Sequence, residues 1–293
     1  MNSAMLYSLR FIQKIDLPEI IKQNIAKLRL VPASYRPARY VKKVVEQSNW
    51  REKVLVEYVR RIRETEDPDY DQMFAIFNKV AKANLDPLSQ EAVGILKKRD
   101  QEFRLRVSTL LFDKAIKGSF YAGIMSELAV KLNSAIPEIS EDLCAQASMF
   151  GTLYDMSGTL VFPRADEEGF EDKIVAWSKQ KDVRRGYSRF LTHLYTVQLI
   201  PSKILHESMQ KVLGDLDDTV VQAKTELSEE NVTQYADFLF EIAKLLPKTA
   251  VELRGLIQTR VDVVLKRPRS ELPSLNMRSR FKLEDTYKCV QAS

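Results

Sequence analysis

The chain has 293 residues, of which 45% are hydrophobic and 29% charged, and its formal net charge is only +5. This apolar content disfavours a disordered chain, and a total of 9 glycines, about 3% against the usual 7%, disfavours a fold rich in hairpins. The chain has two cysteines and two histidines, which disfavours a disulfide framework and a His-rich metal site. No apolar run approaches the ~18 residues of a membrane span, which disfavours a membrane protein. A soluble, cytoplasmic chain is therefore expected.

Residues 1–65 are predicted to form a basic, helical N-terminal extension. Between Glu19 and Glu46 the sequence has no acidic residue, whereas cationic side chains recur throughout. Such a run is often a solvated helix face, but with Tyr35 and Tyr40 interleaved it can also contact RNA phosphates and stack on bases. The candidate RNA-binding residues are Arg36, Arg39, Lys42 and Lys43. Helices are expected over 17–29, 37–47 and 51–64, with a proline-marked linker at 31–38.

Residues 66–293 carry apolar residues at helical spacing from end to end and are expected to form one helical domain. In 102–117 the apolar residues recur at every third or fourth position, which places them on one face of a helix. Gly118 follows as a helix stop. Further helices are expected over 70–83, 88–99, 120–133 and 139–154.

Acidic loops are predicted to interrupt the middle of this domain. Residues 157–172 mix glycine, proline and acids, which is typical of a long loop. The acidic run 215–218 is predicted to be a second loop. Ser202 follows Pro201 and is expected to cap a helix. The helices expected around these loops cover 171–180, 183–197, 202–214 and 216–226.

The clearest helix covers 229–246, where apolar residues follow the i, i+3, i+4, i+7 pattern. Ser228 is expected to cap its start, and Pro247 ends it. A basic, proline-bearing loop is expected at 266–275, between helices over 249–266 and 276–290. Pairs of these helices occupy roughly 40–47 residues, the period of HEAT repeats. The predicted fold class is all-α, a HEAT-like array of antiparallel helix pairs (an α-solenoid), with a plain globular helical domain as the alternative.

The sequence holds no arrangement that indicates catalysis. It has no glycine-rich phosphate loop, no dinucleotide-binding glycine pattern, no H-E-x-x-H and no C-x-x-C. Neither His193 nor His206 has a neighbouring pattern that would pair it with a nucleophile, and His193 is expected to be structural. We therefore predict no enzyme, no cofactor and no metal site. Stacked helical pairs instead favour an interaction scaffold.

Three segments in order carry mixed patterns of apolar, basic and acidic residues. The first covers 71–85 and continues over 110–121, and its matching residues are Ile76, Phe77, Asn78, Lys79, Val80, Leu85, Phe112, Asp113, Lys114, Ala115, Ile116 and Phe120. The second covers 184–213, with matches at Arg184, Arg185, Phe190, Leu191, Leu194, Tyr195, Leu199 and Ile200. The third covers 276–289, with matches at Arg278, Arg280, Phe281, Leu283, Glu284 and Asp285. Together they resemble the middle domain of eukaryotic translation initiation factor 4G.

The resemblance implies a translation initiation scaffold that binds RNA and a DEAD-box RNA helicase of the initiation factor 4A type, and stimulates the helicase during mRNA recruitment to the ribosome. The two ends of the array would touch the helicase's two lobes and so favour one lobe arrangement. The implied N-terminal contact consists of Phe77, Asn78, Val80 and Leu85. The implied C-terminal contact consists of Arg280, Phe281 and Asp285. Core packing is the alternative for Phe77, Val80 and Phe281.

The chain also departs from the family pattern. Val80 and Leu85 replace a leucine and an aromatic residue. The pattern for binding the cap-binding protein, a tyrosine followed after four residues by leucine and an apolar residue, is not met at Tyr7 or Tyr40, so that partner is not supported. Other initiation factors stay open as partners. The alternative functions are a related adaptor in mRNA decay, splicing or cap binding, and a helical protein-interaction scaffold unrelated to RNA.

Overall fold

In a computed structural model, the structure describes residues 18–29, 67–118, 120–156 and 158–291. The chain divides into two units, Met1–Glu64 and Thr65–Ser293. In the first unit the described element is the helix α2 (Glu19–Arg29). The predicted helices 37–47 and 51–64, the linker and the RNA-binding candidates Arg36, Arg39, Lys42 and Lys43 lie outside the described residues.

The second unit is helical, and its described residues contain no strand. Its helices are α4 (Pro68–Lys79), α5 (Leu85–Leu96), α6 (Gln101–Lys117), α7 (Tyr121–Ala135), α8 (Glu138–Ser148), α9 (Phe150–Met156), α10 (Phe170–Thr196), α11 (Ser202–Val220), α12 (Glu226–Leu245), α13 (Val251–Lys266) and α14 (Met277–Gln291). Single 3-10 turns occur at Lys82–Asn84 and Arg269–Glu271. The predicted all-α fold class is confirmed.

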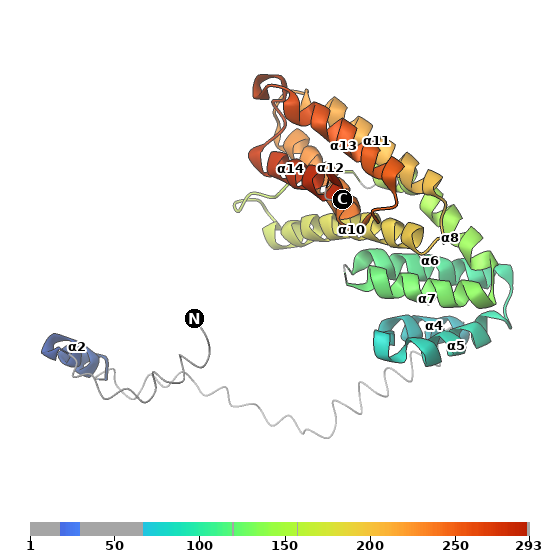
Figure 1. Ribbon diagram of the computed structural model, residues 1–293. Helices are drawn as coiled ribbons and strands as arrows, with labels where there is room; N and C mark the ends of the chain where they lie inside the picture. Colours follow the sequence, from blue (N-terminus) through green and yellow to red (C-terminus); the bar gives the residue numbers. More distant parts are fainter. Residues whose placement is uncertain (1–17, 30–66, 119, 157, 292–293) are drawn as a thin grey trace. The chain divides into compact units, whose positions relative to one another are not determined.

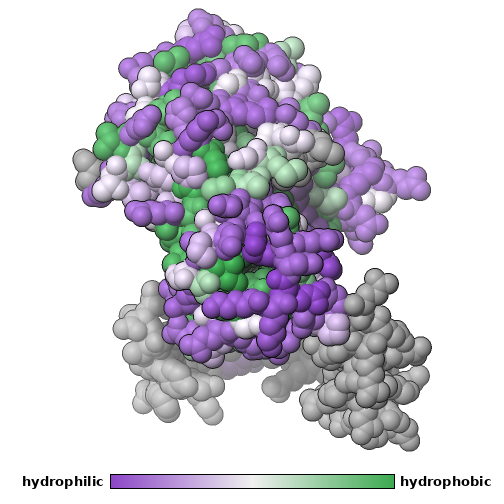
Figure 2. Space-filling view, turned by 90° about the vertical axis from the view of Figure 1, so that its right-hand side faces the viewer, coloured by the Kyte–Doolittle hydropathy of each residue, from purple (hydrophilic) through white to green (hydrophobic). Residues whose placement is uncertain are grey.

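These helices pack in two layers. One layer, which we call the inner layer, contains α4, α6, α10, α12 and α14, each packed against the next (Figure 1). The other contains α5, α7, α8, α11 and α13, which cover the inner helices pairwise. Figure 2 shows that hydrophilic residues cover much of one face of the molecule, with hydrophobic patches between them. This layered stacking of helix pairs is the arrangement of a HEAT-like array.

Side-chain caps fix where several helices begin. Asp100 accepts a hydrogen bond from the backbone N–H of Phe103 at 3.0 Å, which satisfies one free donor at the start of α6. The start of α12 differs from the prediction, because Thr225 is its N-cap and Ser228 lies three residues inside. The two residues form a capping box in which each side chain accepts from the other's backbone N–H, at 3.0 and 2.9 Å.

Some predicted boundaries in the middle of the domain are wrong. α10 is one helix of 27 residues, because no glycine or proline separates the predicted segments 171–180 and 183–197. The predicted acidic loop 215–218 lies inside α11, where Arg260 pairs with Asp217 and so offsets the acidic run. The N-cap of α11 is Pro201, with no side-chain cap from Ser202. The predicted helix 139–154 is divided at Met149 into α8 and α9.

Candidate protein-interaction surface

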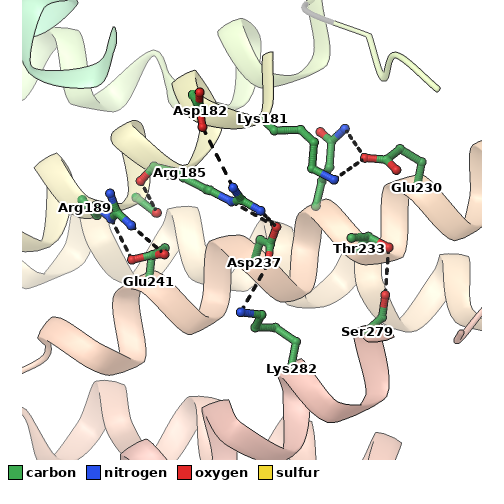
Figure 3. Close-up of polar contacts among 12 residues, drawn as sticks. Lys181, Asp182, Arg185, Arg189, Glu230, Thr233, Asp237, Glu241, Ser279 and Lys282 are labelled. Atoms are coloured by element: carbon green, nitrogen blue, oxygen red, sulfur yellow. Dashed lines mark hydrogen bonds and ion pairs between the residues drawn. The ribbon is translucent and has the colours of Figure 1, made fainter. Parts of the chain in front are cut away.

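A ladder of ion pairs joins three helices of the inner layer. Lys181, Arg185 and Arg189 stand four residues apart on α10, so they lie on one face of that helix. Each meets a carboxylate of α12 (Figure 3): Lys181 Nζ lies 2.9 Å from Glu230 Oε1, Arg185 pairs with Asp237, and Arg189 Nε lies 2.7 Å from Glu241 Oε2. The ladder therefore fixes α10 and α12 in one register.

The helix α14 is joined to the same ladder. Lys282 Nζ lies 3.8 Å from Asp237 Oδ1, so this carboxylate serves cations from two helices. The buried hydroxyls of Thr233 and Ser279 share a hydrogen bond of 2.9 Å between α12 and α14 (Figure 3). Because α10, α12 and α14 are tied together, side chains on the last helix are presented from a rigid support.

At the N-terminal end of the array, three of the four residues implied by the resemblance lie in the core. Phe77 is 1% exposed, and Val80 and Leu85 are also buried. Core packing, which the sequence left open for Phe77 and Val80, is what the structure shows. Asn78 is exposed, and its side-chain oxygen accepts a hydrogen bond from Lys114 of α6.

Exposed aromatic residues lie on the same helix as Asn78 and against its partner Lys114. Phe74 lies one turn earlier on α4 and is half exposed. Lys114 lies over the ring of Tyr121, 5.0 Å from its centroid, and the preceding Phe120 is 96% exposed. The resemblance included Phe120 as a motif position, whereas sequence reasoning missed Phe74 and Tyr121 as surface residues. The four-residue spacing of Phe74 and Asn78 places them on one face of the helix, and this is the sequence signal that could have identified Phe74.

At the C-terminal end, α14 presents an exposed stripe. Phe281 is 55% exposed, so the core-packing alternative for this residue is wrong. Asp285 and Met277 are also exposed, and both lie one turn from Phe281. Arg280 is more buried: its Nη2 donates to the carbonyl of Leu265 at 2.9 Å. It therefore joins α14 to the last turn of α13, and its position is structural.

Half-buried His193 supports the packing of α10 against α7, where it lies beside Gly123. Burial and the neighbouring Arg189 lower the pKa of His193 from its ordinary value of 6.5, while Glu127 raises it more weakly. In the described residues, no group of three or more His, Cys, Asp or Glu could hold a metal ion. The contact of His193 with Gly123 agrees with a structural histidine.

A pH titration tests the role of His193. Because its folded-state pKa is lowered, the neutral form stabilises the fold above pH 6.5, and this contribution is lost as pH falls toward the folded-state pKa. We expect the free energy of unfolding to decline between about pH 7.5 and 5.5, and to decline less in His193→Gln. Urea denaturation at each pH measures it. Equal declines in both proteins would assign the pH dependence to other groups.

The fold and these surfaces define a helical scaffold domain. No described helix is long and apolar enough to cross a membrane. The chain belongs to the MIF4G domain family, which matches residues 71–291. It is also similar to a protein of Cucumis melo named eukaryotic translation initiation factor 4G, with 22% identity over 234 residues. That match covers 70% of this chain and 12% of the melon protein, so the chain spans a small part of this relative's length. The resemblance seen in the sequence is confirmed.

Proposed function

We propose that this chain is a cytoplasmic scaffold in translation initiation that binds a DEAD-box RNA helicase of the initiation factor 4A type, together with RNA. The observation that carries the proposal is the exposure of Phe281 within the third family-like segment, on the last helix of the inner layer. Aromatic residues, phenylalanine among them, are enriched at protein interfaces. The family membership and the name of the melon relative support the translational role.

Each end of the array exposes an aromatic side chain and, one turn away on the same helix, a polar side chain. Asn78 and Phe74 stand on α4, the first helix of the inner layer, and Phe281 and Asp285 stand on α14, the last. A helicase with two lobes can therefore be contacted at both ends of one rigid domain. Differential contact with one lobe arrangement would shift the helicase equilibrium toward that arrangement.

The departures from the family pattern do not weaken this surface. Val80 and Leu85, which replace a leucine and an aromatic residue, are both buried. Their substitution changes core volume and leaves the exposed residues of α4 in place. The proposed N-terminal contact is therefore made by Asn78 with its aromatic neighbours, and the proposed C-terminal contact by Phe281 with Asp285.

Helicase stimulation tests the proposal. We expect the purified chain to raise the RNA-dependent ATPase rate of initiation factor 4A. We expect Phe281→Ala to weaken helicase binding by about 2 kcal/mol, or roughly 30-fold, because an anchor side chain is lost from the interface. Binding can be measured by calorimetry and stimulation by phosphate release. Circular dichroism should stay unchanged, since Phe281 does not pack in the core.

The matched control is Phe162→Ala, which removes a phenylalanine of similar exposure on another part of the domain. It should leave ATPase stimulation unchanged. If the wild-type chain binds no initiation factor 4A, the proposal fails, and the alternatives are another helicase or an adaptor unrelated to RNA. Arg280 is a poor test residue, because charge reversal there would remove its bond to α13.

A further inference from the structure

The loop between α9 and α10, residues 158–169, is held in a defined shape on the domain. The carbonyl of Gly158 accepts hydrogen bonds from Gln180 and from Arg184, the latter at 2.8 Å. The backbone N–H of Leu160 donates to Gln180 Oε1 at 2.9 Å. Farther along, Arg164 Nη2 lies 2.8 Å from Glu226 Oε1, in the first turn of α12. The loop is thus tied to two helices.

This loop exposes an apolar ridge. Phe162 is 51% exposed and packs edge-to-face on Trp177 of α10, with ring centroids 5.0 Å apart. Leu160, two residues earlier in the same loop, is also exposed. Apolar side chains grouped on a fixed loop are typical of an interaction site.

A hollow lies on either side of the ridge. One has a volume of about 570 Å³ and extends from the loop to Glu230 and Asn276. The other has a volume of about 300 Å³ and extends to Lys173 and Ala176 of α10. Both are lined by 161–163 and by Glu226, so Phe162 stands between them. An extended peptide could cross the ridge with side chains in both hollows.

The charge around the ridge indicates which kind of peptide it binds. Carboxylates line the hollows or lie close to them in the sequence: Glu167, Glu226, Glu229 and Glu230 line them, and Asp166, Glu168, Glu171 and Asp172 belong to the same loop or to the first turn of α10. Four of them are paired, Glu226 with Arg164, Glu167 with Lys173, Glu230 with Lys181 and Glu229 with Lys224. Among the described residues, no ion pair engages the other four, Asp166, Glu168, Glu171 and Asp172, and all four are exposed. The surplus negative charge repels nucleic acid phosphates and attracts cations.

We propose that the ridge and its hollows bind a basic segment of a protein partner, with an apolar side chain against Phe162 and lysine or arginine side chains on Glu171 and Asp172. The apolar contact supplies affinity, and the carboxylates select a cationic segment. Neither Asn78 nor Phe281 lines the hollows, so the basic segment belongs to a partner other than the helicase.

Trp177 offers a direct reporter of this binding. The chain has 2 tryptophans, so Trp50→Phe leaves Trp177 as the source of tryptophan emission. The probe is a ten-residue peptide of alternating arginine and leucine, titrated into the full chain at low and moderate salt. We expect a saturable change in emission, with an affinity that weakens as salt rises. Phe162→Ala, and separately Glu171→Lys with Asp172→Lys, should each weaken binding by about tenfold.

The matched control reverses Glu138 and Glu141, which occupy the first turn of α8 as Glu171 and Asp172 occupy that of α10. It makes the same change in net charge and should leave binding within about twofold. A peptide of alternating glutamate and leucine should not bind. Equal losses in the control and the site variant, or a stronger response to single-stranded RNA than to the basic peptide, would overturn the proposal. Phe281→Ala should have no effect, which separates this site from the helicase surface.

Discussion

Gly186→Ala is expected to destabilise the domain by about 3 kcal/mol or more, because α10 and α6 meet at this glycine without room for a side chain. A Cβ atom built on Gly186 would lie 1.9 Å from the carbonyl oxygen of Ile116. That oxygen belongs to the backbone, so the clash is relieved only if the two helices move apart. The aromatic contacts that join them, such as Phe112 with Phe190, would loosen as well. Urea denaturation followed by circular dichroism measures the loss.

Gly214→Ala is the control for this change. Gly214 lies inside α11, and a Cβ atom built on it would have no atom within 4 Å. Alanine there should stabilise the domain by up to about 1 kcal/mol, because it favours the helix over the unfolded chain. The same substitution should therefore change the free energy of unfolding in opposite directions at the two positions. A similar effect at both would mean that the contact between α10 and α6 is not tight.

The sequence predicted the helices well because their signals are local. The helices predicted from apolar spacing over 102–117 and 229–246 correspond closely to α6 and α12. Errors arose where the deciding interaction is distant in sequence. The predicted helices 171–180 and 183–197 left a gap at Lys181 and Asp182, yet Lys181 lies inside α10 and is buried against Glu230, which lies 49 residues away. Such a pairing is set by tertiary packing and cannot be seen in a short window.

The candidate surface was predictable only in part, for a related reason. Phe77 and Phe281 both occupy apolar positions of helices and both match the family pattern, but Phe77 is buried and Phe281 exposed. A helix in a two-layer array packs against several neighbours, so periodicity marks an apolar face without saying which residues remain uncovered. The contacts of Lys114 with Asn78 and Tyr121 join three helices, and they become visible only once these helices are packed.

Asp237→Ala is expected to cost about 2–3 kcal/mol of unfolding free energy, because it removes the centre of the ion-pair ladder. Asp237 is 7% exposed and serves both Arg185 of α10 and Lys282 of α14. Its removal leaves two partly buried cations without this carboxylate. Chemical denaturation should show the loss, and high salt should change it little since the group is shielded from solvent.

The contrasting variant is Asp262→Ala, which breaks an exposed pair with Lys266 within α13 and should cost less than about 0.5 kcal/mol. Replacing Arg185 by methionine in the Asp237→Ala background should recover part of the loss, because one uncompensated charge disappears. A positive coupling in this double-mutant cycle would assign the stabilisation to the pair itself. Additive losses would mean that Asp237 acts through packing alone, and the rigidity that supports Phe281 would then come from the apolar contacts of α12 with α14.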